Sequence, residues 1–304
     1  MSCVWHRDVV SAYEQVNLAL PDGRTLEVFV GGADDGIPLV YHNGSPSSGR
    51  PYGPFIELAE ERGLRLVTYS RAGYSASTRK AGRSVADVVG DVAAVLDRVG
   101  ASECYTMGWS GGGPHALACA ALLPERVIAA ACVAGVAPYP SAGLDWMGEM
   151  GAENQAEFGA ALQGPAELQG FLEQAGSWVA NSTADSVAAD FGDLVSDVDI
   201  SSITGDFAEW LAVGFRESVS HGIWGWFDDD RAFLKPWGFD LAEIERPVGI
   251  WQGGQDRMVP FAHGQWLAQH VGSATPHLLP DEGHLSLAVA SMASILDELT
   301  ATHP

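Results

Sequence analysis

The sequence has little positive charge. Its 304 residues include 16 Lys and Arg against 39 Asp and Glu, which gives a net charge of -23, and only Lys80 and Lys235 are lysines. Phosphate backbones and anionic lipid surfaces are bound by clustered Lys and Arg. We therefore expect a small-molecule substrate, with no nucleic-acid partner and no membrane partner.

Long apolar segments and metal-type cysteine patterns are also missing. The longest apolar stretch, residues 127–137, is too short to cross a bilayer, and the first ten residues contain no apolar signal region. Cys3, Cys104, Cys119 and Cys132 lack the spacing of a metal site and are expected to be reduced core residues. The sequence thus predicts a cytoplasmic protein with no metal and no other cofactor, and leaves its oligomeric state open.

What the sequence does contain is an alternation of strand and helix patterns. Alternating apolar residues on either side of Pro21-Asp22-Gly23 predict an opening β-hairpin. An apolar stripe predicts a helix over residues 84–99, with Ser84 as its cap. Strands are expected at 37–41, 64–69, 104–107, 127–134, 248–251 and 276–279, and further helices at 52–62 and 114–123. This order predicts an α/β fold with a mostly parallel central sheet covered by helices on both faces.

The composition changes between residues 140 and 240. This segment has 18 acidic residues against 3 basic ones, and it holds eight of the eleven phenylalanines and six of the ten tryptophans. Its apolar patterns are helical rather than alternating. We predict a core domain formed by residues 1–139 and 241–304, with residues 140–240 inserted as a helical cap, or lid.

Aromatic side chains of this insertion are candidates for a substrate pocket. Trp224, Trp226 and Phe227 are expected to line an apolar pocket, although each could instead pack between the lid and the core. The neighbouring Asp228-Asp229-Asp230 is expected to form a solvated loop or a helix cap, because no oxygen-ligand loop pattern surrounds it.

A glycine-rich turn between a strand and a helix is the most informative motif. Gly108-Trp109-Ser110-Gly111-Gly112 fits the pattern G-x-S-x-G, in which a strained turn lifts a serine hydroxyl above the sheet. A strand pattern precedes the motif, and Pro114 suits the first turn of the helix that follows. The alternative is a glycine-rich turn with a bystander serine. The context favours Ser110 as a nucleophile, with Trp109 beside it contacting substrate.

An acid and a base follow later strands. Asp256 comes just after the strand at 248–251, where parallel sheets place functional groups. Its alternative role is to cap the helix expected to begin near Pro260. His284 lies on a loop after the last strand, whereas His115 is expected to point away from the serine hydroxyl. Ser110, Asp256 and His284 would form a hydrolytic triad in the order nucleophile, acid, base.

Acyl transfer also needs donors for the developing oxyanion. The Gly111 N–H at the start of the elbow helix is one candidate. The second donor is expected from the loop after the first parallel strand, with the Ser45 N–H as our choice and Gly44 or Asn43 as alternatives.

These motifs together resemble the α/β-hydrolase superfamily over nearly the full chain apart from the lid. Residues 41–46, YHNGSP, are similar to the H-G-x-P oxyanion turn, and residues 69–77, YSRAGYSAS, to the stretch D-x-R-G-x-G-x-S. Asn43 and Ser70 depart from the usual His and Asp. The resemblance implies a lid inserted after the sixth strand, with the active site beneath it. Ser110 stands where haloalkane dehalogenases and epoxide hydrolases have an aspartate, which argues against those branches.

The predicted function is cofactor-free serine hydrolysis through an acyl-enzyme, on carboxylic esters of small, largely apolar substrates. One alternative is an aminopeptidase-like enzyme of the proline iminopeptidase type, in which acidic lid residues bind a free amine. A carbon–carbon bond hydrolase is a second alternative. A ligand-binding receptor that retains a triad is the non-enzymatic one.

Overall fold

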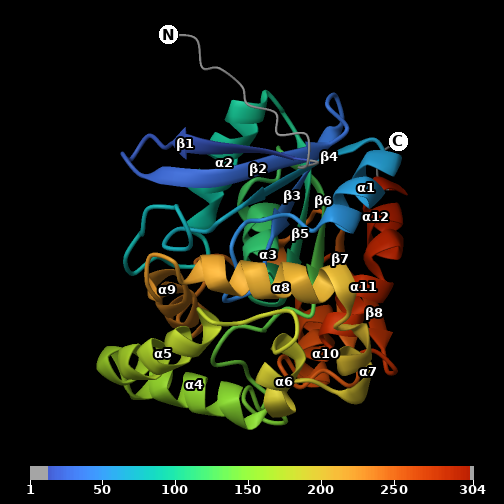
Figure 1. The fold of residues 1–304 in the computed structure, drawn as a ribbon. Coiled ribbons are helices and arrows are strands. Elements are labelled where there is room, and N and C mark those ends of the chain that lie inside the picture. Colours follow the sequence, from blue (N-terminus) through green and yellow to red (C-terminus); the bar gives the residue numbers. More distant parts are fainter. Residues whose placement is uncertain (1–12, 302–304) are drawn as a thin grey trace.

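A single eight-stranded sheet forms the centre of the computed structural model, which describes residues 13–301 (Figure 1). The strand order is β1-β2-β4-β3-β5-β6-β7-β8. β1 (Tyr13–Ala19) and β2 (Thr25–Gly32) form the predicted antiparallel hairpin, and β2 also pairs antiparallel with β4. All other pairs are parallel, and they join β3 (Ile37–His42), β4 (Leu64–Tyr69), β5 (Cys104–Trp109), β6 (Val127–Val133), β7 (Val248–Gly253) and β8 (Ala274–Leu279). The predicted fold class is confirmed.

Helices cover both faces of this sheet and enclose two apolar cores. One core is formed with α2 (Val88–Val99), α3 (Gly113–Leu122) and α10 (Phe261–His270), and the other with α1 (Gly53–Glu61), α11 (Leu285–Ala290) and α12 (Met292–Ala301). Successive residues of β3 show the division, since Val40 lies in the first core and Leu39 in the second. The sheet is therefore buried on both sides.

Helix α2 begins later than its apolar stripe predicts. The Ser84 N–H and hydroxyl both donate to the Asp87 carboxylate, at 2.7 and 2.8 Å, and the helix starts at Val88. Ser84 thus belongs to a turn before the helix and does not cap it. Val85 is still buried with the stripe, which explains why the periodicity extends beyond the helix.

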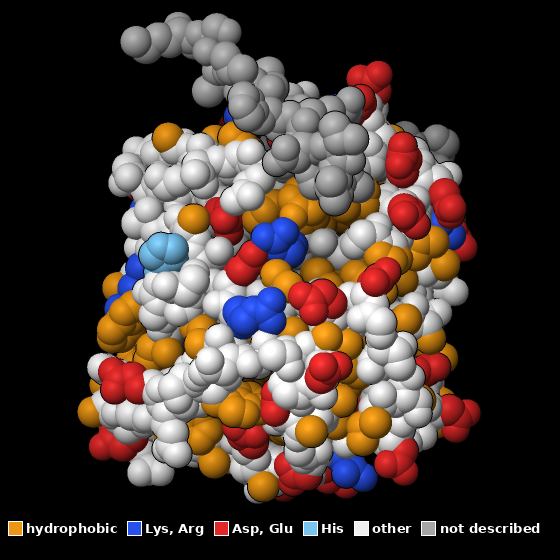
Figure 2. Space-filling view, in the orientation of Figure 1, with side chains coloured by type: hydrophobic (Ala, Val, Ile, Leu, Met, Phe, Trp, Pro, Cys, Tyr) orange, Lys and Arg blue, Asp and Glu red, His pale blue; other side chains and the backbone are white. Residues whose placement is uncertain are grey.

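Residues 140–240, called here the helical insertion, contain six α-helices and connect β6 to β7. They are α4 (Ala152–Gln163), α5 (Pro165–Val179), α6 (Val187–Asp190), α7 (Asp197–Ser202), α8 (Gly205–Ser218) and α9 (Trp224–Phe233). Figure 1 shows them gathered at one end of the sheet, on the side away from the β1–β2 hairpin. Figure 2 shows that red acidic side chains outnumber blue basic ones on this face of the molecule. The status of the helical insertion as a separate cap domain stays a prediction.

Two further expectations concern cysteines and membrane segments. Cys104, Cys119 and Cys132 are buried and free, as predicted, and Cys3 lies outside the described residues. None of the helices formed by residues 13–301 combines the length and the apolar composition needed to cross a membrane.

Candidate active site

Ser110 occupies a strained turn at the carboxyl end of β5. Its φ is 55°, and a single 3-10 turn, Ser110–Gly112, links the strand to α3. The turn is tight enough that a Cβ on Gly108 would lie 2.1 Å from the Gly112 carbonyl oxygen. A Cβ on Gly112 would lie 2.0 Å from the carbonyl oxygen of His42. Only glycine fits these two positions, and the backbone around them holds Ser110 in its left-handed conformation.

His284 and Asp256 meet above neighbouring strands. The Nδ1 of His284 lies 2.7 Å from Oδ2 of Asp256, and both side chains are buried. The other carboxylate oxygen of Asp256 accepts hydrogen bonds from the N–H groups of Met258 and Val259, at 2.9 and 2.8 Å. These bonds order the loop after β7, whereas α10 begins later, at Phe261. Asp256 therefore does not cap that helix.

The environment of His284 favours a charged imidazole. Burial alone would lower its pKa, but the charge and hydrogen bond of Asp256 outweigh burial, so the pKa lies above its ordinary value. The bond at Nδ1 leaves Nε2 for the cavity that His284 and Ser110 both line. The described residues show no hydrogen bond between Ser110 and His284. In structures without substrate, such bonds are often long.

The loop after β3 lies directly against the Ser110 turn. A Cβ on Gly44 would lie 3.3 Å from Cβ of Ser110, and a Cβ on Gly111 would lie 2.4 Å from Oγ of Ser45. Asn43 turns its side chain away, because its Nδ2 donates to the Ser48 carbonyl at 2.9 Å. The structure thus brings together Gly44, Ser45, Ser110 and Gly111, the four residues expected to form the nucleophile and its oxyanion hole.

The three consecutive aspartates of α9 are buried rather than solvated, so that prediction is wrong. Their exposed fractions are 1%, 0% and 1% for Asp228, Asp229 and Asp230. Asp228 forms an ion pair with Arg79 at 2.7 Å, and Asp229 pairs with both Arg71 at 2.6 Å and Arg83 at 2.5 Å. These arginines precede the helix by more than 140 residues, which is why the local acidic run suggested solvent.

Asp229 connects the helical insertion to the loop after β3, which carries the expected oxyanion donors. Its Oδ2 accepts hydrogen bonds from the Ser45 hydroxyl at 2.6 Å and from the Tyr74 hydroxyl at 2.9 Å. Burial opposes ionisation of this carboxyl, but the charges of Arg71 and Arg83 outweigh it and hold its pKa well below the usual range. Arg71 also donates to the Gly44 carbonyl at 3.0 Å, so one charged cluster fixes both Gly44 and Ser45.

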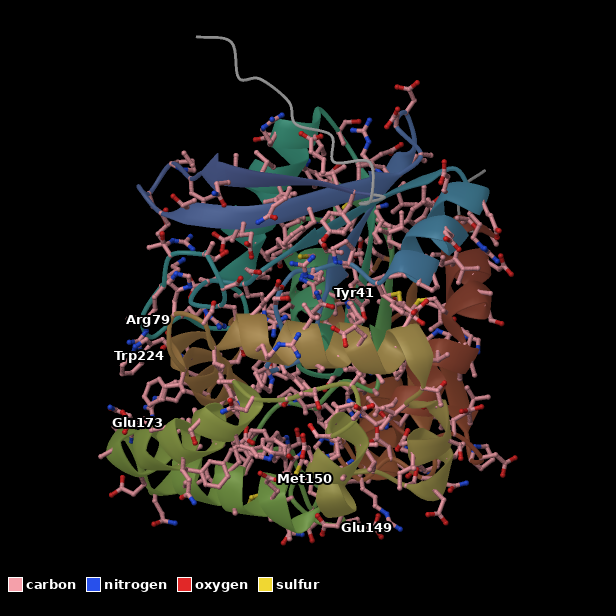
Figure 3. The ribbon with its side chains drawn as sticks, viewed as in Figure 1. Tyr41, Arg79, Glu149, Met150, Glu173 and Trp224 are labelled. Atoms are coloured by element: carbon pink, nitrogen blue, oxygen red, sulfur yellow. The ribbon has the colours of Figure 1, made fainter. Side chains whose placement is uncertain are left out.

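A cavity of about 130 Å³ opens in front of Ser110 and His284, between the sheet and the helical insertion. Trp109 and Trp226 line it, as predicted. Trp224 and Phe227 do not: Trp224 lies under the Arg79 guanidinium, at 4.1 Å, and its ring is 5.7 Å from that of Phe227. Figure 3 shows Trp224 beside Arg79 at the edge of the molecule. The other aromatic wall residues are Phe158, Trp178, Phe191, Trp210, Phe215 and Phe233.

Two carboxyl groups in this wall were missed by sequence reasoning. Glu157 of α4 and Asp230 of α9 both line the cavity and are buried. One indication in the sequence was the position of Glu157, which shares the buried face of α4 with Phe158 and Ala161. In an acidic helix, however, a single inward glutamate cannot be told from its solvent-facing neighbours. The described residues contain no group of three or more His, Cys, Asp or Glu arranged to hold a metal ion.

The sequence matches a known family along most of its length. A model of the alpha/beta hydrolase fold family matches residues 37–290. The chain belongs to this family. Its strand order and the position of the Ser110 turn between β5 and α3 agree with that membership.

The individual relatives match this chain over only part of their length. The chain is 33% identical over 106 residues to the uncharacterized hydrolase YcgS of Bacillus subtilis, which covers 35% of this chain. It spans 36% of that protein's length and 48% of a second curated relative.

Solved structures share the fold over nearly the whole chain. An esterase from Exiguobacterium antarcticum has 17% identity and a TM-score of 0.67, covering 94% of this chain and 99% of its own. A meta-cleavage product hydrolase from Pseudomonas fluorescens has 15% identity and a TM-score of 0.67, covering 96% and 98%.

Proposed function

We propose that this α/β hydrolase is a cofactor-free serine hydrolase that acts on carboxylic esters of small, largely apolar substrates through an acyl-enzyme. The observation that carries the proposal is the 2.7 Å contact between His284 Nδ1 and Asp256 Oδ2, with His284 and the strained Ser110 facing one cavity. The aromatic lining of this cavity favours apolar acyl groups. The similarity to an esterase structure supports the fold that this mechanism requires.

In the proposed mechanism, Ser110 Oγ attacks the ester carbonyl while His284 Nε2 takes the serine proton. The protonated imidazole then gives this proton to the departing alcohol, which leaves an acyl group on Ser110. Water attacks the acyl-enzyme, its proton passing to Nε2 and then to Ser110, and the carboxylic acid is released. Asp256 fixes the imidazole tautomer and stabilises its positive charge throughout.

The oxyanion would be bound by backbone N–H groups beside Ser110. The Gly111 N–H lies at the start of the helix after the nucleophile, and the Ser45 N–H is our choice for the second donor, with Gly44 next to it. Neither Gly44 nor Ser45 uses its N–H in a hydrogen bond to another described residue. Helices α4 to α9 would act as the lid that keeps bulk water from this site.

The test compares three variants on a series of 4-nitrophenyl esters. Ser110→Ala and His284→Ala should lower kcat by about four to six powers of ten, because each removes a group that takes part in making and breaking bonds rather than in binding the substrate. Ser47→Ala is the matched control, since Ser47 lines the same cavity. It should stay within about threefold of wild type.

Covalent labelling by a fluorophosphonate gives an independent readout of the nucleophile. The wild-type chain and Ser47→Ala should be labelled, and Ser110→Ala should not. Labelling of Ser110→Ala, or near-wild-type ester turnover by it, would overturn the serine mechanism.

A further inference from the structure

Two carboxyl groups face each other in the wall of the cavity. Glu157 and Asp230 are 7% and 1% exposed, and they lie close enough for the charge of Glu157 to act on Asp230. The indole N–H of Trp226 donates to Oε1 of Glu157 at 2.7 Å. Oδ2 of Asp230 is buried and has no hydrogen-bond partner among the described residues. Asp230 thus brings to the cavity wall a carboxyl oxygen that no other group within residues 13–301 uses.

The neighbouring aspartates of α9 are neutralised, but this pair is not. Asp228 and Asp229 each contact arginine side chains, whereas neither Glu157 nor Asp230 has an ion-pair partner within residues 13–301. Arg83 is close enough to act on Asp230 through its charge, but its two terminal nitrogens donate to Asp229 and to the Gly225 carbonyl, and its Nε has no hydrogen-bond partner among the described residues. Buried carboxyl groups without a cation are costly. Packing of α4 against α9 does not by itself account for two buried carboxyl groups at these positions.

The charge of the pair is limited by burial. Burial raises the pKa of Glu157 to about 7, and burial together with the charge of Glu157 raises the pKa of Asp230 well above its usual range. The negative charge of the pair therefore falls as the pH drops through about 7.

We propose that the Glu157–Asp230 pair is the subsite for an ammonium group on an amphipathic substrate, whose apolar part lies along the aromatic wall. An ammonium group brings donors for the unpaired Asp230 oxygen and a positive charge that complements the negative charge of the pair. A hydroxyl group could satisfy the oxygen but not the charge. The position of the substrate's carbonyl at Ser110 rests on the proposed function, while ammonium binding itself does not.

The surrounding charged groups define what else could respond to pH. Glu153 lies one turn before Glu157 on α4 and is half-buried, Asp229 is held by Arg71 and Arg83, and His284 faces the same cavity. A neutral ligand of the same shape experiences changes in His284 and Glu153 without gaining an ion pair. Because His284 gains positive charge as the pH falls, the ratio between a charged and a neutral ligand isolates the carboxyl pair when it is also measured in His284→Ala.

The experiment measures binding of n-butylammonium and n-butanol to the full chain by calorimetry. At pH 8 the wild-type chain should bind n-butylammonium about 10- to 100-fold tighter than n-butanol, the range of hydrogen bonds to charged groups. Because one amide substitution could leave a charge on the other carboxyl, the test variant is the double substitution Glu157→Gln with Asp230→Asn. It should lose the preference to within about threefold, whereas Glu167→Gln, a control at an exposed carboxyl of α5 outside the cavity, should keep it.

A second arm compares the wild-type chain with His284→Ala and remains decisive if the double variant fails to fold. Between pH 8 and pH 5.5 the preference for n-butylammonium should fall in both chains, because the pair loses negative charge as the pH drops through about 7, while n-butanol affinity stays level. Equal affinities at pH 8, a preference that does not change with pH, or an undiminished preference in a folded double variant would each overturn the subsite. Ester turnover and fluorophosphonate labelling test Ser110 separately, so either proposal can fail without the other.

Discussion

Asp229 is the residue on which the geometry beside Ser110 most depends. It is fully buried, its two oxygens contact Arg71 and Arg83, and it also accepts from the hydroxyl groups of Ser45 and Tyr74. An aspartate of the helical insertion thus fixes the loop that carries the expected oxyanion donors. Loss of its charge would leave two buried guanidinium groups without compensation.

We predict that Asp229→Asn lowers the free energy of unfolding by about 3–5 kcal/mol, the cost of breaking a buried ion pair. It should also lower kcat more than it raises KM, because the loop after β3, which carries the expected oxyanion donors, loses its support. Urea denaturation and nitrophenyl ester kinetics measure the two effects. Asp228→Asn is the matched control, because its partner Arg79 is partly exposed. Equal losses in the two variants would contradict the role given to Asp229.

For single residues, the local sequence context determined which positions and environments could be predicted. Ser110, Asp256 and His284 each lie beside the end of a strand with its own strong pattern, so their convergence followed from the topology. Asp230 was predicted to be solvated, because nothing near it in the sequence indicates that Arg71 and Arg83 enclose its neighbour. Long-range ion pairs leave no local pattern, and burial of an acidic run can only be seen in the folded chain.

At the scale of elements, a neutral histidine joins α10 to the segment between β6 and α4. Nδ1 of His263 accepts from the Ala137 N–H at 3.0 Å, and Nε2 donates to the Trp146 carbonyl at 2.8 Å. This arrangement requires an unprotonated Nδ1. Burial lowers the pKa of His263 to about 4, in agreement with those bonds.

A dependence of stability on pH follows from this contact. Between pH 6.5 and about 4 the unfolded chain binds a proton at His263 that the folded chain does not, so the free energy of unfolding falls as pH falls through this window. The contribution is about 3 kcal/mol over the full window, at about 1.4 kcal/mol per pH unit. His263→Asn should show a shallower slope in urea denaturation series at pH 6.5, 5.5 and 4.5.

The control for this prediction is His270→Asn, on the same helix but exposed. Its slope should match wild type. His42 and His115 also have pKa values lowered by burial, and they remain in both variants, so the difference between slopes is the readout. An unchanged slope in His263→Asn would contradict the assignment.

Element boundaries could be predicted where residue patterns alone define them. The strand at 64–69 agrees with β4 because its apolar run is bounded on both sides by glycine or polar residues. Helix α2 begins three residues after Val85 because the Asp87 carboxylate accepts hydrogen bonds from both the N–H and the hydroxyl of Ser84. This competition between a side chain and the helix backbone leaves no periodic pattern in the sequence, so the start of the helix could not be predicted.

At the scale of the whole molecule, two cavities meet at a pair of tryptophans. The cavity in front of Ser110 has about 130 Å³, and a second, apolar cavity of about 110 Å³ lies between the helical insertion and the core. Trp109 and Trp210 line both, with ring centroids 6.2 Å apart. The indole N–H of Trp109 donates to the His284 carbonyl at 3.2 Å, and that of Trp210 donates to the Arg50 carbonyl at 2.8 Å. We infer that this pair sets the limit on acyl length.

Trp210→Ala should therefore join the two cavities and move the acyl preference toward longer chains. We expect the ratio of kcat/KM between 4-nitrophenyl octanoate and butyrate to rise by about 10- to 200-fold, the range for a few methylene groups in an apolar pocket. The ratio is the measured quantity because loss of the indole also weakens packing against Phe207, which affects both esters alike. Trp224→Ala removes an equal side chain outside both cavities and should leave the ratio within about twofold of wild type. If Trp224→Ala shifts the ratio as far as Trp210→Ala, the effect comes from loosening the helical insertion, and the two tryptophans do not divide the cavities.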